Sequence, residues 1–293
     1  MKKLIQTKCP AWFLTIVVYA VTLQASCKQR NADSPAGYDL NKPRKMELGK
    51  VLNEISGLAF NEEDSSLIAI SDSKEKVFGI ELKKLKLKDI TGKVVPTNSD
   101  LEDVTKVNNT LYLLSSPGKI ITVPNGTQDT AGVIGYDIGL QDKNDFESLY
   151  YDPSVQGLVM ICKTCAFEKG KHLRTAFRFD LSTKKFDSTA FFTISKADVE
   201  VLLKDKDIKF DPSAAAINPV SKRLFILSSA GNLLVVTDTR GKAVEAFKLN
   251  PDKFPQAEGI AFAPNGDMYI SNEGKFGKAT LLFFPYHQGK KNK

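Results

Sequence analysis

Acidic residues recur at two fixed places in a short motif that appears five times along the chain. The third place of the motif holds Glu102, Glu147 and Glu258. Two residues earlier, the motif carries Glu54, Asp100, Asp145 and Asp211. Carboxylates gathered at one place repel each other and shift each other's pKa unless a cation neutralises them. Because no histidine or cysteine accompanies them, these hard oxygen donors predict a site for calcium or magnesium, and calcium is the expected ion.

A second tier of polar residues is expected near the same site: Asp72, Asp103, Asn272 and Glu273. The alternative interpretation is structural, because acidic side chains at turns also cap backbone amides and would hold neighbouring repeats together without a metal. A Ser-His-Asp site, a histidine-rich metal centre and a phosphate-binding loop are all disfavoured, since the chain holds only two histidines, His172 and His287, and no glycine-rich phosphate loop. Any hydrolysis would therefore have to be metal-assisted.

Five copies of one unit must position these acids. The third residues of the five motifs are Ser56, Glu102, Glu147, Ser213 and Glu258. Their spacings are 46, 45, 66 and 45 residues, so the third copy carries about 21 extra residues. The last copy shows the unit most clearly, with a Glu-Gly step, a β-prone run, the turn Pro264-Asn265-Gly266-Asp267 and a second β-prone run. A repeat of this period indicates the architecture of the whole chain.

Each copy has room for four short strands, which is one blade of a β-propeller. A blade cannot bury both of its faces alone, so we predict an all-β, five-bladed β-propeller with blades of about 45 residues. A six-bladed ring, with an extra blade starting from Leu40 to Val51, is the alternative. The extra residues of the third blade fall in 163–171 and 195–203, and the latter predict an inserted short helix with Ser195 as its N-cap.

The N-terminus predicts export. Residues 1–26 combine three lysines with a short apolar run and small residues, as in a signal peptide, and the run is shorter than the roughly 20 residues of a membrane span. Cys27 stands where a bacterial lipoprotein carries its lipid, which predicts lipidation, with cleavage by an ordinary signal peptidase as the alternative. We therefore expect a signal peptide at 1–26, a lipid-anchored tether at 27–47, the propeller at 48–286 and a basic tail at 287–293.

The net charge and the cysteine content limit the classes of partner and the cellular compartment that the sequence predicts. The formal charge of +7 falls to 7 − 3 = +4 without residues 1–26, and the lysines are not interleaved with aromatic residues, so nucleic acid is disfavoured as a partner. The sequence after Cys27, Lys28-Gln29-Arg30, lacks an acidic cluster, which favours a membrane-anchored, periplasm-facing lipoprotein of the cell envelope. Cys162 and Cys165 are the only pair expected within the fold, and two close cysteines in an exported protein predict a disulfide, with an inert thiol as the alternative.

The repeat openings at 54–59, 145–149 and 256–261, with Ser271-Asn272-Glu273-Gly274, resemble the SdiA-regulated (YjiK-like) family of envelope β-propellers. The resemblance covers about residues 48 to 285. It implies a cell-envelope protein related to calcium-dependent propellers with phytase-like or esterase-like names. The last copy is also similar, more weakly, to calcium-dependent sugar lactonases of the senescence-marker type, which share the Glu-Gly and Pro-Asn-Gly steps.

Two functions from different classes follow. The first is an envelope-anchored, calcium-binding propeller that binds a protein or small-molecule ligand at its channel mouth. The second is a calcium-dependent hydrolase that acts on a phosphoester or a lactone at the same mouth. The fold class does not choose between them, because one propeller scaffold hosts many functions.

Overall fold

The computed structural model describes residues 33–91, 99–124, 133–274 and 277–288. The predicted signal peptide, the lipidation site Cys27 and all but the first two residues of the predicted basic tail lie outside the described residues. In the part of the chain that is described, no helix has both the length and the apolar character needed to cross a membrane.

Twenty-one strands in the described residues form five antiparallel sheets, each of which is one blade. The first blade comprises β2 (Ile55–Asn61), β3 (Ser66–Ser71), β4 (Lys76–Glu81) and β5 (Lys86–Asp89). The second comprises β6 (Leu101–Val107), β7 (Thr110–Ser115), β8 (Lys119–Pro124) and β9 (Ile134–Asp137). The third comprises β10 (Asn144–Asp152), β11 (Gly157–Cys165), β12 (Leu173–Asp180), β13 (Lys185–Phe186) and β14 (Phe192–Ser195).

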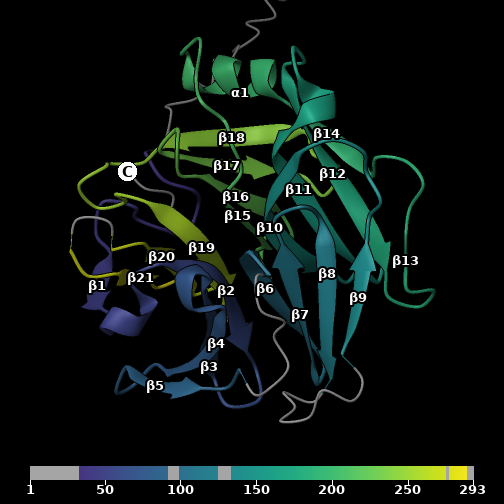
Figure 1. The fold of residues 1–293 in the computed structure, drawn as a ribbon. Coiled ribbons are helices and arrows are strands. Elements are labelled where there is room, and N and C mark those ends of the chain that lie inside the picture. Colours follow the sequence, from purple (N-terminus) through teal and green to yellow (C-terminus); the bar gives the residue numbers. More distant parts are fainter. Residues whose placement is uncertain (1–32, 92–98, 125–132, 275–276, 289–293) are drawn as a thin grey trace, which may run out of the picture. The chain divides into compact units, whose positions relative to one another are not determined.

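The last two blades follow the same plan. The fourth comprises β15 (Ala214–Ile217), β16 (Leu224–Ser228), β17 (Leu233–Thr237) and β18 (Ala243–Lys248). The fifth comprises β19 (Ala257–Phe262), β20 (Met268–Asn272), β21 (Thr280–Phe284) and, from the other end of the chain, β1 (Arg44–Glu47). Figure 1 shows the five inner strands, β2, β6, β10, β15 and β19, gathered at the centre of the blades.

The inner strands contact one another in a closed ring, in the order β2, β6, β10, β15, β19 and back to β2. Middle strands such as β16 and β17 are buried along their whole length. Both faces of these strands are apolar, so each blade must pack between two others, as the sequence predicts. The five-bladed, all-β propeller is therefore confirmed.

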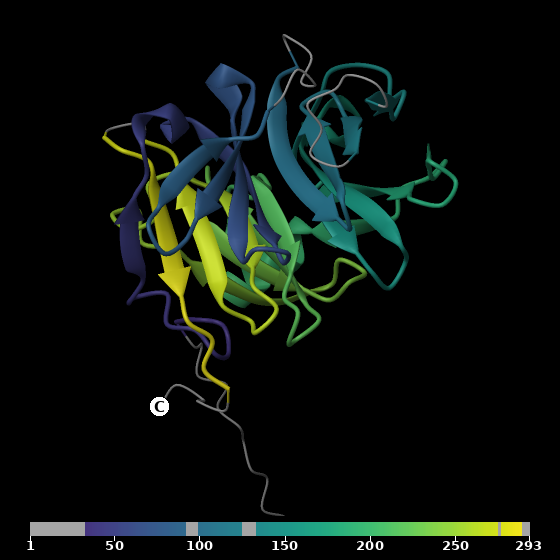
Figure 2. The same ribbon diagram turned by 90° about the horizontal axis from the view of Figure 1, so that it is seen from below.

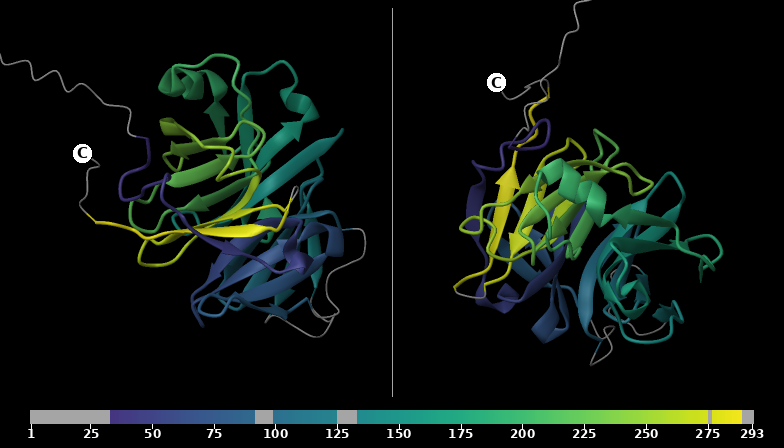
Figure 3. Two further views of the ribbon diagram at one scale, coloured as in Figure 1. Left: turned by 90° about the vertical axis from the view of Figure 1, so that its left-hand side faces the viewer. Right: turned by 90° about the horizontal axis from the view of Figure 1, so that it is seen from above.

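The ring closes through the N-terminal segment. Strand β1 pairs antiparallel with β21, with Arg44 opposite Phe283 and Glu47 opposite Thr280. Figures 2 and 3 show this purple strand beside the yellow C-terminal strands. The segment from Leu40 to Val51 thus supplies the outer strand of the fifth blade and a turn of 3-10 helix (Lys50–Leu52), so the six-bladed alternative is wrong.

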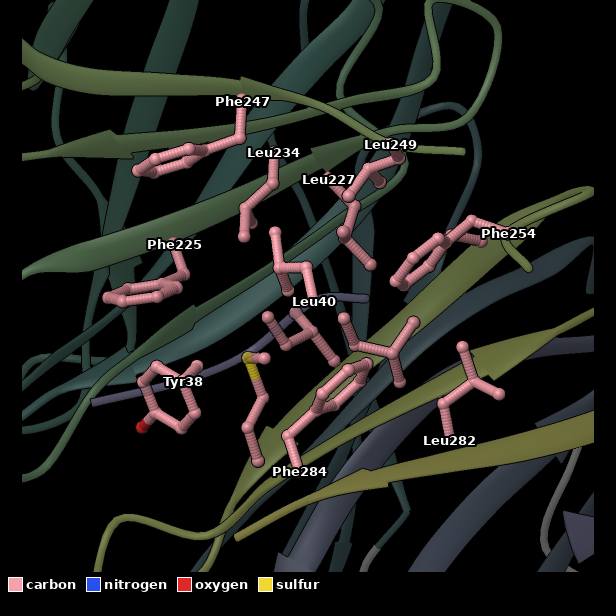
Figure 4. Packing of buried hydrophobic residues seen from close by; sticks show 14 of the residues in the cluster. Tyr38, Leu40, Phe225, Leu227, Leu234, Phe247, Leu249, Phe254, Leu282 and Phe284 are labelled. Atoms are coloured by element: carbon pink, nitrogen blue, oxygen red, sulfur yellow. The ribbon is translucent and has the colours of Figure 1, made fainter. Parts of the chain in front are cut away.

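Residues before the predicted propeller boundary at 48 belong to the folded unit. Tyr38 and Leu40 are buried between the fourth and fifth blades, together with Phe225 and Phe284 (Figure 4). The Tyr38 hydroxyl donates a hydrogen bond of 2.5 Å to the carbonyl oxygen of Gly266. The packed fold therefore includes much of the segment that we expected to be a tether.

The third blade carries the predicted insertions. Strand β11 runs on to Cys165, which forms a disulfide with Cys162, and a 3-10 turn (Ala166–Glu168) follows. Helix α1 (Lys196–Leu203) begins after Ser195, whose hydroxyl accepts a hydrogen bond from the backbone N–H of Asp198, as expected for an N-cap. The helix contacts β18 of the fourth blade (Figure 1).

Candidate metal centre

In four of the five repeats, the motif that opens the repeat forms an irregularity in the inner strand. The register of β6 with β7 shifts between Leu101 and Asp103, which leaves Glu102 without a paired residue. Equivalent shifts leave Glu147 unpaired in β10 and Glu258 unpaired in β19. A β-bulge re-aims the side chain of its extra residue, and bulges are common next to functional sites. The bulge thus explains why one glutamate in three of the blades turns toward the channel end that we call the acidic mouth.

Three carboxylates meet at the acidic mouth. One side-chain oxygen each of Glu102, Asp145 and Glu147 lies within 4.8 Å of the other two, and all three residues are partly buried. They come from β6 and β10, the inner strands of the second and third blades, which contact each other. Asp145 is held in place by two hydroxyl donors, Ser116 Oγ at 3.1 Å and Thr164 Oγ1 at 3.0 Å.

An apolar ring lies along the channel beyond these acids. It consists of the fifth residue of each repeat opening, Leu58, Val104, Leu149, Ala215 and Ile260, which are all buried. The channel that they help to line has a volume of about 180 Å³. The glutamates therefore stand at the edge of an environment with a low dielectric constant, where a charged carboxylate is poorly solvated.

Burial and mutual repulsion raise the pKa of the glutamates. The pKa of Glu102 rises to about 9, first because of burial and then because of Glu147 and other acids nearby. The pKa of Glu258 rises to about 8 for the same two reasons, although a hydrogen bond with the Ser229 side chain opposes the shift. Burial raises the pKa of Glu147 to about 7, against the lowering effect of Lys163.

Lys163 brings a positive charge into this group of acids. Its ammonium group donates a short hydrogen bond to Glu147 Oε1, and its pKa is raised by that bond and by the charges of Glu147, Asp145 and Glu258, against the effect of burial. The residue stands between the two cysteines of the disulfide. This ion pair was not predicted from the sequence.

A signal for Lys163 was present in the repeats. The residue occupies the last place of the three-residue segment that closes the second β-prone run of its repeat, and the other repeats hold Asp72, Ser116, Ser229 and Asn272 at this place. Ser116 bonds to Asp145 and Ser229 bonds to Glu258, so this place also faces the acidic mouth. The alignment alone would therefore have assigned Lys163 to the site.

Asp103 has the structural role that is the alternative to metal binding: it accepts backbone hydrogen bonds and holds neighbouring repeats together. This carboxylate is 3% exposed and accepts hydrogen bonds from the backbone N–H groups of Leu149 at 2.6 Å and Val104 at 2.8 Å, and from that of Leu58. Because these residues belong to the third, second and first blades, Asp103 joins three inner strands. A Cβ atom on Gly57 would lie 2.5 Å from the Asp103 Cα, so the close approach requires glycine there.

Serines take the same structural role where the motif lacks a glutamate. The Ser56 hydroxyl donates to the carbonyl oxygen of Leu101 in the next blade at 3.3 Å. The Ser213 hydroxyl donates to the carbonyl oxygen of Ala257 at 2.8 Å, again in the next blade. The third place of the motif therefore holds blades together in two repeats and presents glutamate to the mouth in the other three.

The remaining predicted ligands divide into two groups. Glu54, Asp100 and Asp72 lie together at the first and second blades, and burial followed by the charges of Asp100 and Glu54 raises the pKa of Asp72. Glu273 raises the pKa of both Glu147 and Glu258, which places it at the same mouth.

Two predicted residues are committed to other partners. Asp211 pairs with Arg174 of β12. Asn272 is fully buried and donates its side-chain amide to Thr280 Oγ1 at 3.1 Å and to the carbonyl oxygen of Lys253 at 3.3 Å. The structure therefore does not bring either of them to the three-carboxylate group.

The donor set of the three-carboxylate group fits a hard divalent cation. Oxygens bound to one calcium ion at about 2.3–2.6 Å lie at most about 5 Å apart, which the observed separations allow. Glu147 Oε2 is buried and has no hydrogen-bond partner among the described residues, so it remains free to coordinate. The opposing feature is Lys163, whose ammonium group occupies the other oxygen of Glu147.

Comparison with known proteins identifies the fold and the family. A family model described as SdiA-regulated matches residues 34–276. A luciferin-regenerating enzyme of known structure is similar at 12% identity and a TM-score of 0.51, over 85% of this chain and 96% of that one. A gluconolactonase from Xanthomonas campestris is similar at 13% identity and a TM-score of 0.50, over 84% and 91% of the two chains. Among curated protein sequences, none matches this chain.

Proposed function

This chain belongs to the SdiA-regulated family, and from that premise we propose that it is a calcium-binding propeller whose cation site is formed by Glu102, Asp145 and Glu147. The observation that carries the proposal is the convergence of three carboxylate oxygens within 4.8 Å at one channel mouth. Oxygen donors alone, without imidazole or thiolate, suit calcium or magnesium better than zinc. The raised pKa values of Glu102 and Glu147 also support it, because a bound cation would relieve their repulsion.

Lys163 would have to leave its present partner when a cation binds. In the structure its ammonium group neutralises part of the negative charge on Glu147. A divalent cation coordinated by Glu147 would repel the ammonium group and take over this role. In this proposal, the ammonium group of Lys163 competes with calcium for Glu147.

Thermal unfolding with excess EGTA and then with millimolar calcium or magnesium tests the cation site. A ligand present at 100 times its dissociation constant stabilises the native state by about 2.7 kcal/mol. For a chain of this size, that corresponds to a rise of about 5–10 °C in Tm. We expect the rise with calcium in the wild type, its loss in Glu102→Gln and Glu147→Gln, and its retention in the control Glu81→Gln, which alters an exposed glutamate of β4. No rise with any divalent ion would refute the proposal.

The proposal extends to the cell envelope and to a ligand. The signal-like residues 1–26 and Cys27 support export and a lipid anchor facing the periplasm. Metabolic labelling with palmitate of wild type and Cys27→Ala tests the anchor, which requires label only in the wild type. At the acidic mouth, the cation would bind a protein or a small molecule through its free coordination positions.

Metal-assisted hydrolysis of a lactone or a phosphoester is the second candidate, and one observation favours it. Glu258, with a pKa of about 8, interacts electrostatically with Glu147 at the proposed cation site. A carboxyl group with a pKa near the working pH is suited to move a proton in general acid–base catalysis. Turnover of model lactones and phosphoesters that is lost in Glu258→Gln while calcium still binds would establish the enzyme. Binding without turnover of either class would leave the ligand-binding function.

A further inference from the structure

A hollow with basic walls lies beside the disulfide of the third blade. It has a volume of about 500 Å³ and is lined by Lys143, Lys169, Lys171 and Arg174, with Thr164 and Glu168 as the other polar residues that matter here. We propose that this hollow, the basic pocket, binds the anionic group, a phosphate or a carboxylate, of a small ligand. The assignment goes beyond the proposed cation site and does not depend on it.

The positive charge of the three lysines is available to a ligand, whereas Arg174 already pairs with Glu168 and Asp211. Glu168, the one acidic residue of the pocket, is 4% exposed and already accepts the backbone N–H of Thr175 at 2.5 Å and pairs with Arg174 at 3.4 Å. Within the described residues, no carboxylate lies within ion-pair distance of Lys143, Lys169 or Lys171. Three unpaired ammonium groups around one hollow favour an anion, and hydrogen bonds from charged donors are about twice as strong as neutral ones.

The backbone that carries these lysines is fixed. The backbone N–H of Ala166 donates to the carbonyl oxygen of Lys143 at 3.0 Å, which ties the segment before β10 to the turn after β11. The N–H of Lys171 donates to the carbonyl oxygen of Glu168 at 2.8 Å, and the N–H of Lys169 donates to that of Ala166 at 3.2 Å. The disulfide ends at Cys165, which also lines the pocket. The three lysines are exposed, and their backbone belongs to a framework shared by two chain segments.

The pocket adjoins the candidate metal centre. Thr164 lines the pocket, and its hydroxyl donates to Asp145 Oδ2 at 3.0 Å. A ligand whose anionic group sits among the lysines would therefore lie beside Thr164, which contacts Asp145. If the proposed function holds, further oxygen atoms of that ligand could reach the cation, and this extension alone rests on the proposed function.

Titration with inorganic phosphate and, separately, with succinate tests the pocket on the chain without its signal peptide. We would measure binding by calorimetry after metal ions have been removed on a chelating resin, at about 150 mM salt so that long-range attraction between exposed charges is screened. The test variant is Lys169→Ala/Lys171→Ala. The matched control is Lys83→Ala/Lys84→Ala, which removes the same charge from two exposed lysines of the first blade.

We expect the wild type and the control to bind at least one of the two probes, and the test variant to bind it at least tenfold more weakly. The preferred probe then identifies the anionic group as phosphate or carboxylate. Binding of neither probe, or equal binding by the test variant and the control, would overturn the proposal. A calcium titration of the same three proteins tests the cation site separately. If calcium does not bind, the proposed cation site is refuted, but the phosphate and succinate results still decide whether the basic pocket binds an anion.

Discussion

Replacement of Lys163 by methionine should make the protein bind calcium more tightly. Methionine keeps much of the length of the side chain but removes the ammonium group that now bonds to Glu147 Oε1. In the wild type, calcium must break this bond before it can use both oxygens of Glu147. In the variant that cost is absent, so the binding free energy becomes more favourable by the net value of the bond.

The size of the effect follows from the environment of the pair. A hydrogen bond to a charged group contributes about 1.5–3 kcal/mol. The side chains of Lys163 and Glu147 are 31% and 14% exposed, so solvent screens the pair in part and the lower half of that range applies. Since about 1.4 kcal/mol corresponds to a tenfold change in affinity, we expect calcium to bind about 10- to 40-fold more tightly.

Competition with a calcium-chelating dye at neutral pH measures the affinity directly. The control is Lys242→Met, which removes an exposed lysine from the fourth blade and should leave the affinity unchanged. Circular dichroism establishes that each variant is folded. Unchanged or weaker calcium binding by folded Lys163→Met would refute the competition between the ammonium group and the cation.

Three further outcomes are expected. Asp103→Ala leaves the N–H groups of three inner strands without their acceptor, and at about 1–3 kcal/mol for each it should lower the free energy of unfolding by at least about 3 kcal/mol in urea denaturation. The carboxyl groups of Glu102, Glu147 and Glu258 bind protons more tightly in the folded protein than in the unfolded one, so Tm in EGTA should fall as pH rises from about 5 to 9, and calcium should suppress that fall. Cys162→Ala/Cys165→Ala opens a four-residue loop and should cost about 2 kcal/mol of unfolding free energy, measured against the oxidised wild type.

Features that repeat along the chain could be predicted from the sequence. The 45-residue period requires only local information, because each unit carries its own strands and turns. The same is true of the N-cap Ser195, which is recognised within one turn of helix. The sequence also predicted that the residues at the third place of the motif lie near one another, since equivalent places in a ring of repeats face the same channel end.

Pairings between distant segments could not be predicted in this way. Strand β1 completes the fifth blade through a partner more than 200 residues away, and no local pattern distinguishes it from the start of another blade. Asp211 pairs with Arg174 of β12 because the third and fourth blades pack side by side, which no local sequence pattern shows. Asp103 resembled the other acids in sequence, and only the close approach of the first blade at Gly57 shows that it is a buried acceptor.

The closure of the ring by β1 has a consequence for how the protein is made. Strand β1 is synthesised more than 200 residues before its partner β21 (Thr280–Phe284). During translation, the fifth blade cannot be completed until β21 has emerged, and β2 has no neighbour in β19 until β19 has emerged. Contacts between such distant segments slow folding. The propeller therefore stays open until β21 has been synthesised, and a chain truncated before residue 280 would lack the closing pair.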